Sequence, residues 1–263
     1  MKVSAAPWKG RILKDQSFTI KKTGKRRAAA FFFFVHTIMA ESPQSEIPTE
    51  YKNGAVEFLG CKIDLSLRPL IPRPETEFWT RHAIADLARR GRSAGRVLDL
   101  FAGSGCVGVA TAKNLPAAAV DFGDIDAAAV EQIKINLKIN RLSGERTRVF
   151  QTDIFENIPP GESYDAILAN PPYVAAERIR EVQRSVLDWE PRRALFGGAD
   201  GLGIIEKFLR RADDFLRPGG IIYMEFDTFQ KISIIKMLKG LSYGSFEFHK
   251  DQFQKWRFIR IKK

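Results

Sequence analysis

Short apolar runs alternate with longer stretches of mixed polarity along most of the chain. We expect strands in the apolar runs, which lie at residues 96–101, 117–124, 147–151, 166–169 and 220–225. We expect helices in the mixed stretches, which lie at 76–90, 127–140 and 201–216 and in one that begins at Cys106. Because strands that alternate with helices form parallel sheets covered on both faces, the pattern predicts an α/β fold.

The two ends of this pattern differ from its centre. Residues 54–67 predict one or two short strands, interrupted at Gly60. The last two predicted strands, 243–249 and 255–262, have no helix between them and should pair antiparallel.

The composition is that of a globular protein, with 44% hydrophobic and 28% charged residues. No apolar run approaches the ~18 residues of a membrane-spanning helix, so no membrane association is predicted. Two cysteines, Cys61 and Cys106, are too few for a disulfide framework and favour a reducing, cytoplasmic location. The three histidines show no metal-ligand spacing, so no metal site is predicted.

The net charge of +11 is concentrated near the N-terminus. Residues 1–38 carry nine basic side chains and one acid, which leaves only +3 for the remaining 225 residues. A stable nucleic-acid-binding surface is therefore not predicted for the body of the protein.

The basic segment has three possible origins. Followed by the apolar run at 28–35, it fits a secretory signal, an organelle address, or upstream sequence translated ahead of a true start at Met39. We expect a basic and polar extension over 1–50, either disordered or preceding that start, and one domain over 51–263. The β segment at 54–67 leads into this domain.

Three acidic residues follow three successive predicted strands. Asp99 precedes the turn Gly103-Ser104-Gly105, Asp124 ends the next strand, and Asp153 follows the third. The glycines let a ligand approach the backbone, and the start of the following helix offers free N–H groups. Asp124 can accept hydrogen bonds from both hydroxyls of a ribose, and Asp153 can meet an adenine amino group. The structural alternatives are a tight turn, a helix cap at Asp124 and a turn residue at Asp153.

The same turn discriminates between cofactors. The run Asp99-Leu100-Phe101-Ala102-Gly103-Ser104-Gly105 resembles the first motif of S-adenosylmethionine-dependent methyltransferases more than a dinucleotide-binding turn. An acid in this motif would repel a pyrophosphate but suits the cationic methionine amino group of S-adenosylmethionine. The predicted cofactor is therefore S-adenosylmethionine rather than NAD.

The motif Asn170-Pro171-Pro172-Tyr173 follows the predicted strand at 166–169. A planar NH2 group is a poor nucleophile, and the Asn170 side-chain oxygen and the Pro171 carbonyl can accept both of its hydrogens and orient it. The prolines stiffen the loop, and Tyr173 can stack on a planar acceptor. The motif fits methylation of a planar nitrogen without separating a glutamine amide from adenine; its structural alternative is a proline-rich turn.

Three motifs together resemble the HemK/PrmC family. They are Pro72-Arg73-Pro74-Glu75-Thr76-Glu77, the Asn-Pro-Pro-Tyr motif at 170–173, and the run from Glu190-Pro191-Arg192 to Leu202. The similarity covers residues 54–263 and includes Asp251. Members of this family are protein-glutamine methyltransferases that act on the Gly-Gly-Gln motif of class I peptide chain release factors.

The resemblance implies a Rossmann-like class I methyltransferase fold, a mostly parallel seven-stranded sheet with an antiparallel C-terminal strand. It also implies that 51–263 is the methyltransferase domain and that a class I release factor is the protein substrate. The acceptor glutamine would contact Asn170, Pro171, Pro172 and Tyr173. The cofactor would contact Phe101, Ala102, Gly103, Ser104, Gly105, Asp124, Ile154 and Asn170, in addition to Asp99 and Asp153.

This chain departs from the family pattern in two ways. Phe101 stands where the family usually has glycine. The helical domain that bacterial members carry ahead of the proline-rich motif is much reduced, because only 71 residues precede Pro72.

Two alternative functions remain. An N6-adenine methyltransferase acting on DNA or RNA would use residues 170–173 on a flipped base, but the body is nearly neutral and shows no target-recognition segment. A non-catalytic methyltransferase-fold binding module would be expected to have a broken motif. The sequence does not determine the oligomeric state or which release factor is used.

Overall fold

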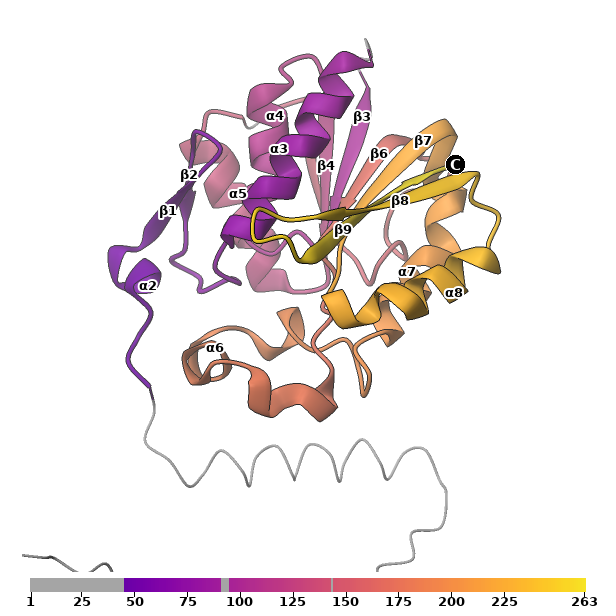
Figure 1. The fold of residues 1–263 in the computed structure, drawn as a ribbon. Coiled ribbons are helices and arrows are strands. Elements are labelled where there is room, and N and C mark those ends of the chain that lie inside the picture. The colour runs from indigo at the N-terminus through magenta and orange to yellow at the C-terminus, as the bar shows by residue number, and fades with distance from the viewer. Residues whose placement is uncertain (1–44, 91–94, 143) are drawn as a thin grey trace, which may run out of the picture. The chain divides into compact units, whose positions relative to one another are not determined.

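A seven-stranded sheet forms the centre of the molecule, in the order β5-β4-β3-β6-β7-β9-β8 (Figure 1). Its strands are β3 (Arg96–Leu100), β4 (Ala119–Asp124), β5 (Thr147–Gln151), β6 (Tyr164–Ala169), β7 (Leu216–Glu225), β8 (Ser245–Lys250) and β9 (Trp256–Lys262). Neighbouring strands from β5 to β7 are parallel, and β9 is antiparallel to both β7 and β8. The predicted fold is confirmed.

The computed structural model describes residues 45–90, 95–142 and 144–263, of which residues Ser45–Lys263 form one compact unit. The expectations for the basic segment, including a start at Met39, lie outside the described residues. The described part begins with α2 (Thr49–Asn53) and the hairpin of β1 (Ala55–Phe58) and β2 (Cys61–Asp64). The backbone φ is positive at both turn residues, Leu59 and Gly60, as two-residue hairpin turns require.

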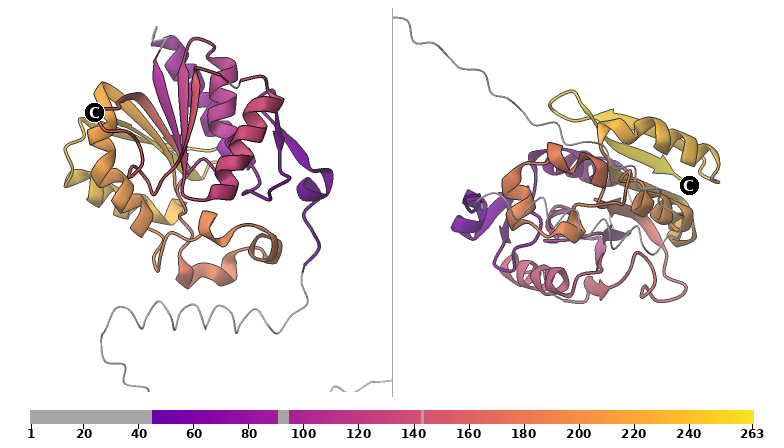
Figure 2. Two further views of the ribbon diagram at one scale, coloured as in Figure 1. Left: turned by 180° about the vertical axis from the view of Figure 1, so that it is seen from behind. Right: turned by 90° about the horizontal axis from the view of Figure 1, so that it is seen from below.

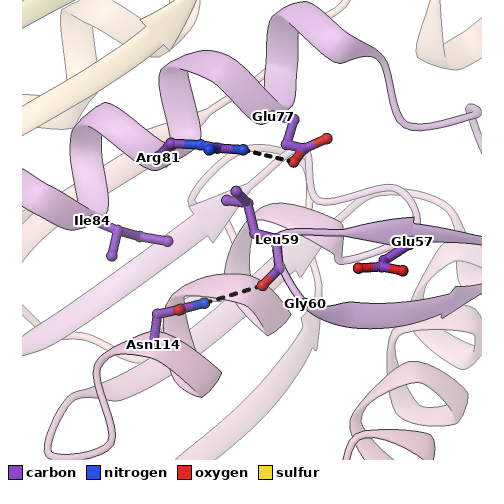
Figure 3. A pocket seen from close by; sticks show the side chains of 7 residues that line it. All are labelled: Glu57, Leu59, Gly60, Glu77, Arg81, Ile84 and Asn114. Carbon is purple, nitrogen blue, oxygen red and sulfur yellow. Dashed lines mark hydrogen bonds and ion pairs between the residues drawn. The ribbon is translucent and has the colours of Figure 1, made fainter.

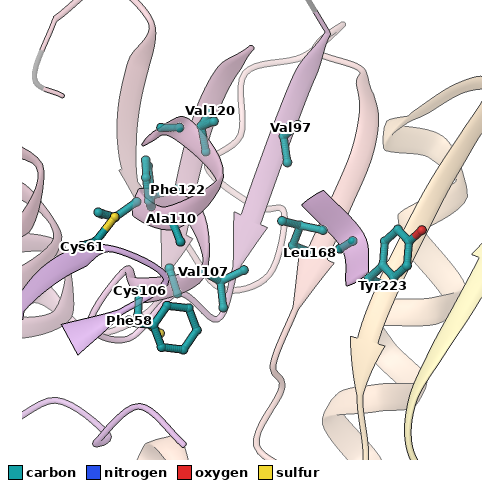
Figure 4. Packing of buried hydrophobic residues seen from close by; sticks show 14 of the residues in the cluster. Phe58, Cys61, Val97, Cys106, Val107, Ala110, Val120, Phe122, Leu168 and Tyr223 are labelled. Carbon is teal, nitrogen blue, oxygen red and sulfur yellow. The ribbon is translucent and has the colours of Figure 1, made fainter. Parts of the chain in front are cut away.

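Helices cover both faces of the sheet (Figures 1 and 2). One face packs against α3 (Pro74–Arg89), α4 (Cys106–Asn114) and α5 (Ala127–Ile139), and the other against α7 (Gly203–Ala212) and α8 (Lys231–Lys239). The strand residues alternate between these two cores: Val97 belongs to the first, Leu98 to the second. Figure 4 shows Val97, Leu168 and Tyr223 from adjacent strands on the first face. Burial on both faces explains why the strands are almost continuously apolar.

The element boundaries differ modestly from those expected. Helix α3 begins at Pro74 rather than residue 76, because proline is favoured at the first helical position. Strand β7 begins at Leu216 rather than 220, since it continues through Pro218-Gly219-Gly220 with an irregular register against β6. Helix α8 has no predicted counterpart. None of the helices in the described ranges has the length and apolar character needed to cross a membrane.

Between β6 and α7 the chain leaves the sheet for a segment of short helices. It contains the 3-10 helix Ala176–Glu181, helix α6 (Arg184–Trp189) and the 3-10 helix Arg192–Ala194. Seen from below, this orange segment lies in front of the sheet, beyond the end to which β6 leads (Figure 2, right). It therefore lies at the edge where the carboxyl ends of the parallel strands meet.

Candidate active site

The turn between β3 and α4 has an unusual backbone. The φ angle is +60° at Phe101, +54° at Gly103 and +76° at Gly105. Glycine adopts such angles freely, whereas at Phe101 the Cβ crowds the backbone at a cost of about 1 to 2 kcal/mol. A Cβ on Gly103 would meet no atom within 4 Å, so open space faces this turn. The backbone of this turn is therefore accessible at Gly103.

Asp124 holds this turn in place from the end of β4. One carboxylate oxygen accepts a hydrogen bond from Gly103 N–H at 2.8 Å, and the other accepts from Asp126 N–H at 2.9 Å. Burial raises the pKa of Asp124 above its ordinary value, although these hydrogen bonds oppose the shift. Each oxygen keeps a second lone pair that can accept a hydrogen bond from a hydroxyl.

Asp99 lies deeper, with 2% of its surface exposed, and accepts a hydrogen bond from Gly108 N–H at 2.7 Å. Its pKa is well above the ordinary value, chiefly because of burial and in part because of the charge of Asp124. Two carboxylates that disfavour each other's ionisation are stabilised by a cation or a hydroxyl donor. These two acceptor carboxylates thus fit the cationic S-adenosylmethionine, with its ribose hydroxyls, better than they fit an anionic phosphate.

The remaining predicted cofactor residues follow β3 and β5. Ala102 and Ser104 are buried within the turn, and the Ser104 carbonyl accepts from the Asn136 side chain at 2.9 Å. Asp153 is exposed beyond β5. Ile154 is buried with φ at +54°, a strained angle for a β-branched residue and one that tends to occur at functional sites.

The Asn-Pro-Pro-Tyr motif at 170–173, called the acceptor loop below, begins where β6 ends, beside the end of β3. The parallel register pairs Leu100 with Ala169, so Asn170 follows directly opposite the cofactor turn. Asn170 is partly exposed, and its side-chain amide forms no hydrogen bond with any described residue. The Pro171 carbonyl likewise accepts no hydrogen bond within the described ranges. Two hydrogen-bond acceptors next to the cofactor turn thus have no partner among the described residues; Asn170 is partly exposed and Pro171 is buried.

Tyr173 is held at both ends. Its hydroxyl donates to Oε1 of Glu225 at 2.9 Å, and its backbone carbonyl accepts from the Gln230 side chain at 2.9 Å. The same Gln230 amide donates to the Gly201 carbonyl at 3.0 Å, which joins the acceptor loop to the start of α7. Gly201 has no room for a side chain, because a Cβ there would lie 2.1 Å from the Tyr173 carbonyl oxygen.

The proline-rich motif at 72–77 and the motif that begins at Glu190 contact each other directly. Arg73 donates to Oε1 of the buried Glu190, whose Oε2 accepts from Ile71 N–H at 3.0 Å. Farther along the proline-rich motif, Thr76 donates to Glu225 at 2.7 Å. The family resemblance singled out both motifs but assigned no role to Glu225 or Gln230. The only local signal for Glu225 is an acid at the end of a buried strand.

A separate groove of about 560 Å³ lies between the β1–β2 hairpin, α3 and α4 (Figure 3). Its lining includes Glu57, Glu77, Arg81 and Asn114, and none of the predicted site residues lines it. In the described part of the chain, no group of three or more His, Cys, Asp or Glu side chains is arranged to hold a metal ion.

Solved structures of methyltransferases share this fold. The hMettl16 catalytic domain in complex with a MAT2A 3′UTR hairpin superposes with a TM-score of 0.63 over 78% of this chain and 75% of its own, at 16% identity. A T. thermophilus 16S rRNA N2 methyltransferase in complex with AdoMet and guanosine gives 0.59 over 80% and 49%, at 21% identity. The sequence profile of the methyltransferase small domain matches residues 80–188.

Sequence relatives are more specific than the structural neighbours. A release factor glutamine methyltransferase of Bacteroides thetaiotaomicron is 35% identical over 82% of this chain and 76% of its own length. One of Streptococcus pneumoniae is 34% identical over 81% and 74%. The chain spans a smaller share, 58%, of the Rhodopirellula baltica relative of the same name, at 36% identity. Identity of this extent, over a domain that carries the three motifs, places the chain in the release factor glutamine methyltransferase family.

Proposed function

We propose that this enzyme transfers the methyl group of S-adenosylmethionine to the side-chain amide nitrogen of the glutamine in the Gly-Gly-Gln motif of class I peptide chain release factors. The proposal includes the cytoplasmic location expected from the sequence, because the substrate acts in translation termination. The observation that carries it is a pair of acceptors opposite the cofactor turn, the Asn170 amide oxygen and the Pro171 carbonyl, which have no hydrogen-bond partner among the described residues.

The residues at the carboxyl ends of β3, β4 and β5 support S-adenosylmethionine as the cofactor. Asp124 would accept the ribose hydroxyls, Asp99 would face the methionine amino group, and Ile154 would pack against the adenine. The raised pKa values of Asp99 and Asp124 favour a ligand that brings a positive charge and hydroxyl donors. Bound S-adenosylmethionine supplies a methyl group on a positively charged sulfur, which takes the C–S electron pair when the bond breaks.

The acceptor loop would prepare the nitrogen. An amide lone pair is delocalised into the carbonyl group. Attack therefore requires the NH2 group to be oriented and the positive charge that develops on its nitrogen to be stabilised. Asn170 and the Pro171 carbonyl would accept one N–H each, which fixes the nitrogen and stabilises the charge that develops on it. As the N–C bond forms, one of the two N–H protons leaves to water. Tyr173 would pack against the planar amide.

The accessibility of the substrate favours glutamine over adenine. A glutamine on a Gly-Gly loop reaches such a pocket without unfolding its protein, whereas a paired base must first be flipped at a cost of a few kcal/mol. The chain beyond residue 38 carries a net charge of only +3, which provides little electrostatic compensation for that cost.

Isotope-labelled S-adenosylmethionine tests the proposal with two substrates. Mass spectrometry should place one added CH2 on the glutamine of a class I release factor, and a release factor with Gln→Ala at that position should accept none. Label on adenine in single-stranded DNA or RNA, with none on the release factor, would instead support the nucleic-acid methyltransferase.

A further inference from the structure

Glu225 is a buried carboxylate that three donors share. It ends β7 with 1% of its surface exposed. Its Oε2 accepts hydrogen bonds from Thr76 Oγ1 and Trp79 Nε1, both at 2.7 Å, while its Oε1 accepts from the Tyr173 hydroxyl at 2.9 Å. Both oxygens are therefore used, and one of the three donors belongs to the acceptor loop.

The surroundings keep the Tyr173 hydroxyl protonated. Burial and the charge of Glu225 raise the pKa of Tyr173 well above its ordinary value, so its hydroxyl remains a donor at neutral pH. The Arg257 guanidinium interacts electrostatically with both Tyr173 and Glu225, and Asp251 holds it at 3.1 Å. A buried carboxylate needs such compensation, because without partners its desolvation would cost several kcal/mol.

The contacts of Tyr173 leave its ring little freedom. Gln230 fixes the backbone carbonyl, and Glu225 fixes the hydroxyl at the far end of the side chain. A tyrosine side chain has two rotatable bonds before the ring, and the hydroxyl lies on the axis of the second, so holding both ends sets the position and the long axis of the ring. Glu225 is in turn fixed by Thr76 and Trp79, which the first turns of α3 present.

We propose that Glu225 is a positioning residue for methyl transfer, which holds the Tyr173 ring at the position that the acceptor amide requires. This inference rests on the proposed function. It assigns the proline-rich motif a part in catalysis without substrate contact, because α3 carries the Thr76 and Trp79 donors that orient Glu225.

A double-mutant cycle tests this inference. Glu225→Gln keeps the shape of the side chain but places an NH2 group, itself a hydrogen-bond donor, among the three groups that donate to Glu225. Tyr173→Phe removes the hydroxyl alone. Each should lower kcat/KM for the release factor by about 10- to 100-fold, with the affinity for S-adenosylmethionine within about threefold of wild type. The double variant should lose no more than the worse single variant, because both remove the same contact.

Asp121 offers a matched control. It too is a buried carboxylate that accepts a tyrosine hydroxyl, from Tyr164 at 3.1 Å, and it pairs with Arg148. Asp121→Asn should lower stability but keep kcat/KM within about threefold of wild type. Additive losses at Glu225 and Tyr173, or Glu225→Gln with wild-type kcat/KM, would overturn the positioning role.

A milder pair of variants serves if Glu225→Gln does not fold. Thr76→Val removes one donor to Glu225 and should lower kcat/KM in the same direction, whereas Thr76→Ser keeps the hydroxyl and should restore it. Equal activity of the two variants would contradict the inference. If the wild type methylates adenine rather than the release factor, the proposed function fails, and the same cycle with that acceptor decides the role of Glu225.

Discussion

The carboxylate of Asp124 accepts a hydrogen bond from the backbone N–H of Gly103 at 2.8 Å, across 21 residues of chain. The end of β4 thereby fixes the turn that follows β3. In the proposed site the same carboxylate would accept the ribose hydroxyls, so Asp124 would both shape the cofactor site and contact the cofactor.

Replacing Asp124 with alanine should weaken S-adenosylmethionine binding by about 10- to 100-fold. Two hydroxyls lose an anionic acceptor. Each hydrogen bond to a charged group contributes about 1.5 to 3 kcal/mol before water that replaces the carboxylate offsets part of the loss. Isothermal titration calorimetry measures the change. Asp126→Ala is the matched control: Asp126 caps α5 through Ala128 N–H, so its loss should cost about 1 kcal/mol of stability and leave affinity unchanged. Unchanged affinity in Asp124→Ala would contradict the ribose assignment.

Asn170→Ala should separate catalysis from cofactor binding. The substitution removes an acceptor that orients the nucleophile, so the methylation rate should fall by a factor of about 10² or more. The affinity for S-adenosylmethionine should stay within about tenfold, because most of its proposed contacts lie on β3, β4 and β5. Single-turnover transfer of labelled methyl measures the rate. Asn114→Ala, at the exposed end of α4, is the control and should keep wild-type turnover. Near-full turnover of Asn170→Ala would exclude the orienting role.

Local patterns were sufficient to predict the sheet. Val97 and Leu98 pack into opposite cores, and the buried strands on both sides of them produce the continuous apolar runs seen in the sequence. Because parallel strands end at one edge, the acids near the carboxyl ends of β3 and β4 could also be assigned to a single site. The strands and their shared edge were therefore predictable from neighbouring residues in the chain, whereas helix α8 was missed.

Contacts between distant segments were not predictable in this way. Glu225 accepts a hydrogen bond from Thr76, which lies 149 residues away in the chain. Nothing near either residue in the sequence indicates the other. The positive φ of Ile154 also gives no local signal, since β-branched residues normally avoid that region. Such features depend on tertiary packing, which neither periodicity nor motif spacing records.

Asp99 should make stability depend on pH in the absence of cofactor. Its pKa in the folded protein is raised well above the ordinary 3.8. Its contribution to stability is therefore complete below about pH 4 and is lost as pH rises through the raised value. Asparagine does not ionise, so the free energy of unfolding of Asp99→Asn relative to wild type should increase from pH 4.5 to pH 7.5. Urea unfolding at both pH values measures this difference; a constant or falling difference would contradict the raised pKa.

Phe101 should show strain and packing acting in opposite directions. Its ring packs edge-on against Phe208 on α7, with centroids 5.7 Å apart, while its backbone φ is +60°. Phe101→Gly relieves the strain and loses the ring, whereas Phe101→Ala loses the ring and keeps the strain. Since a left-handed backbone costs a non-glycine residue about 1 to 2 kcal/mol, and glycine's greater freedom in the unfolded chain offsets part of that, the order of stability should be wild type, then glycine, then alanine. Urea unfolding without cofactor ranks the three proteins. An alanine variant as stable as the glycine variant would show that residue 101 does not hold a left-handed backbone in solution.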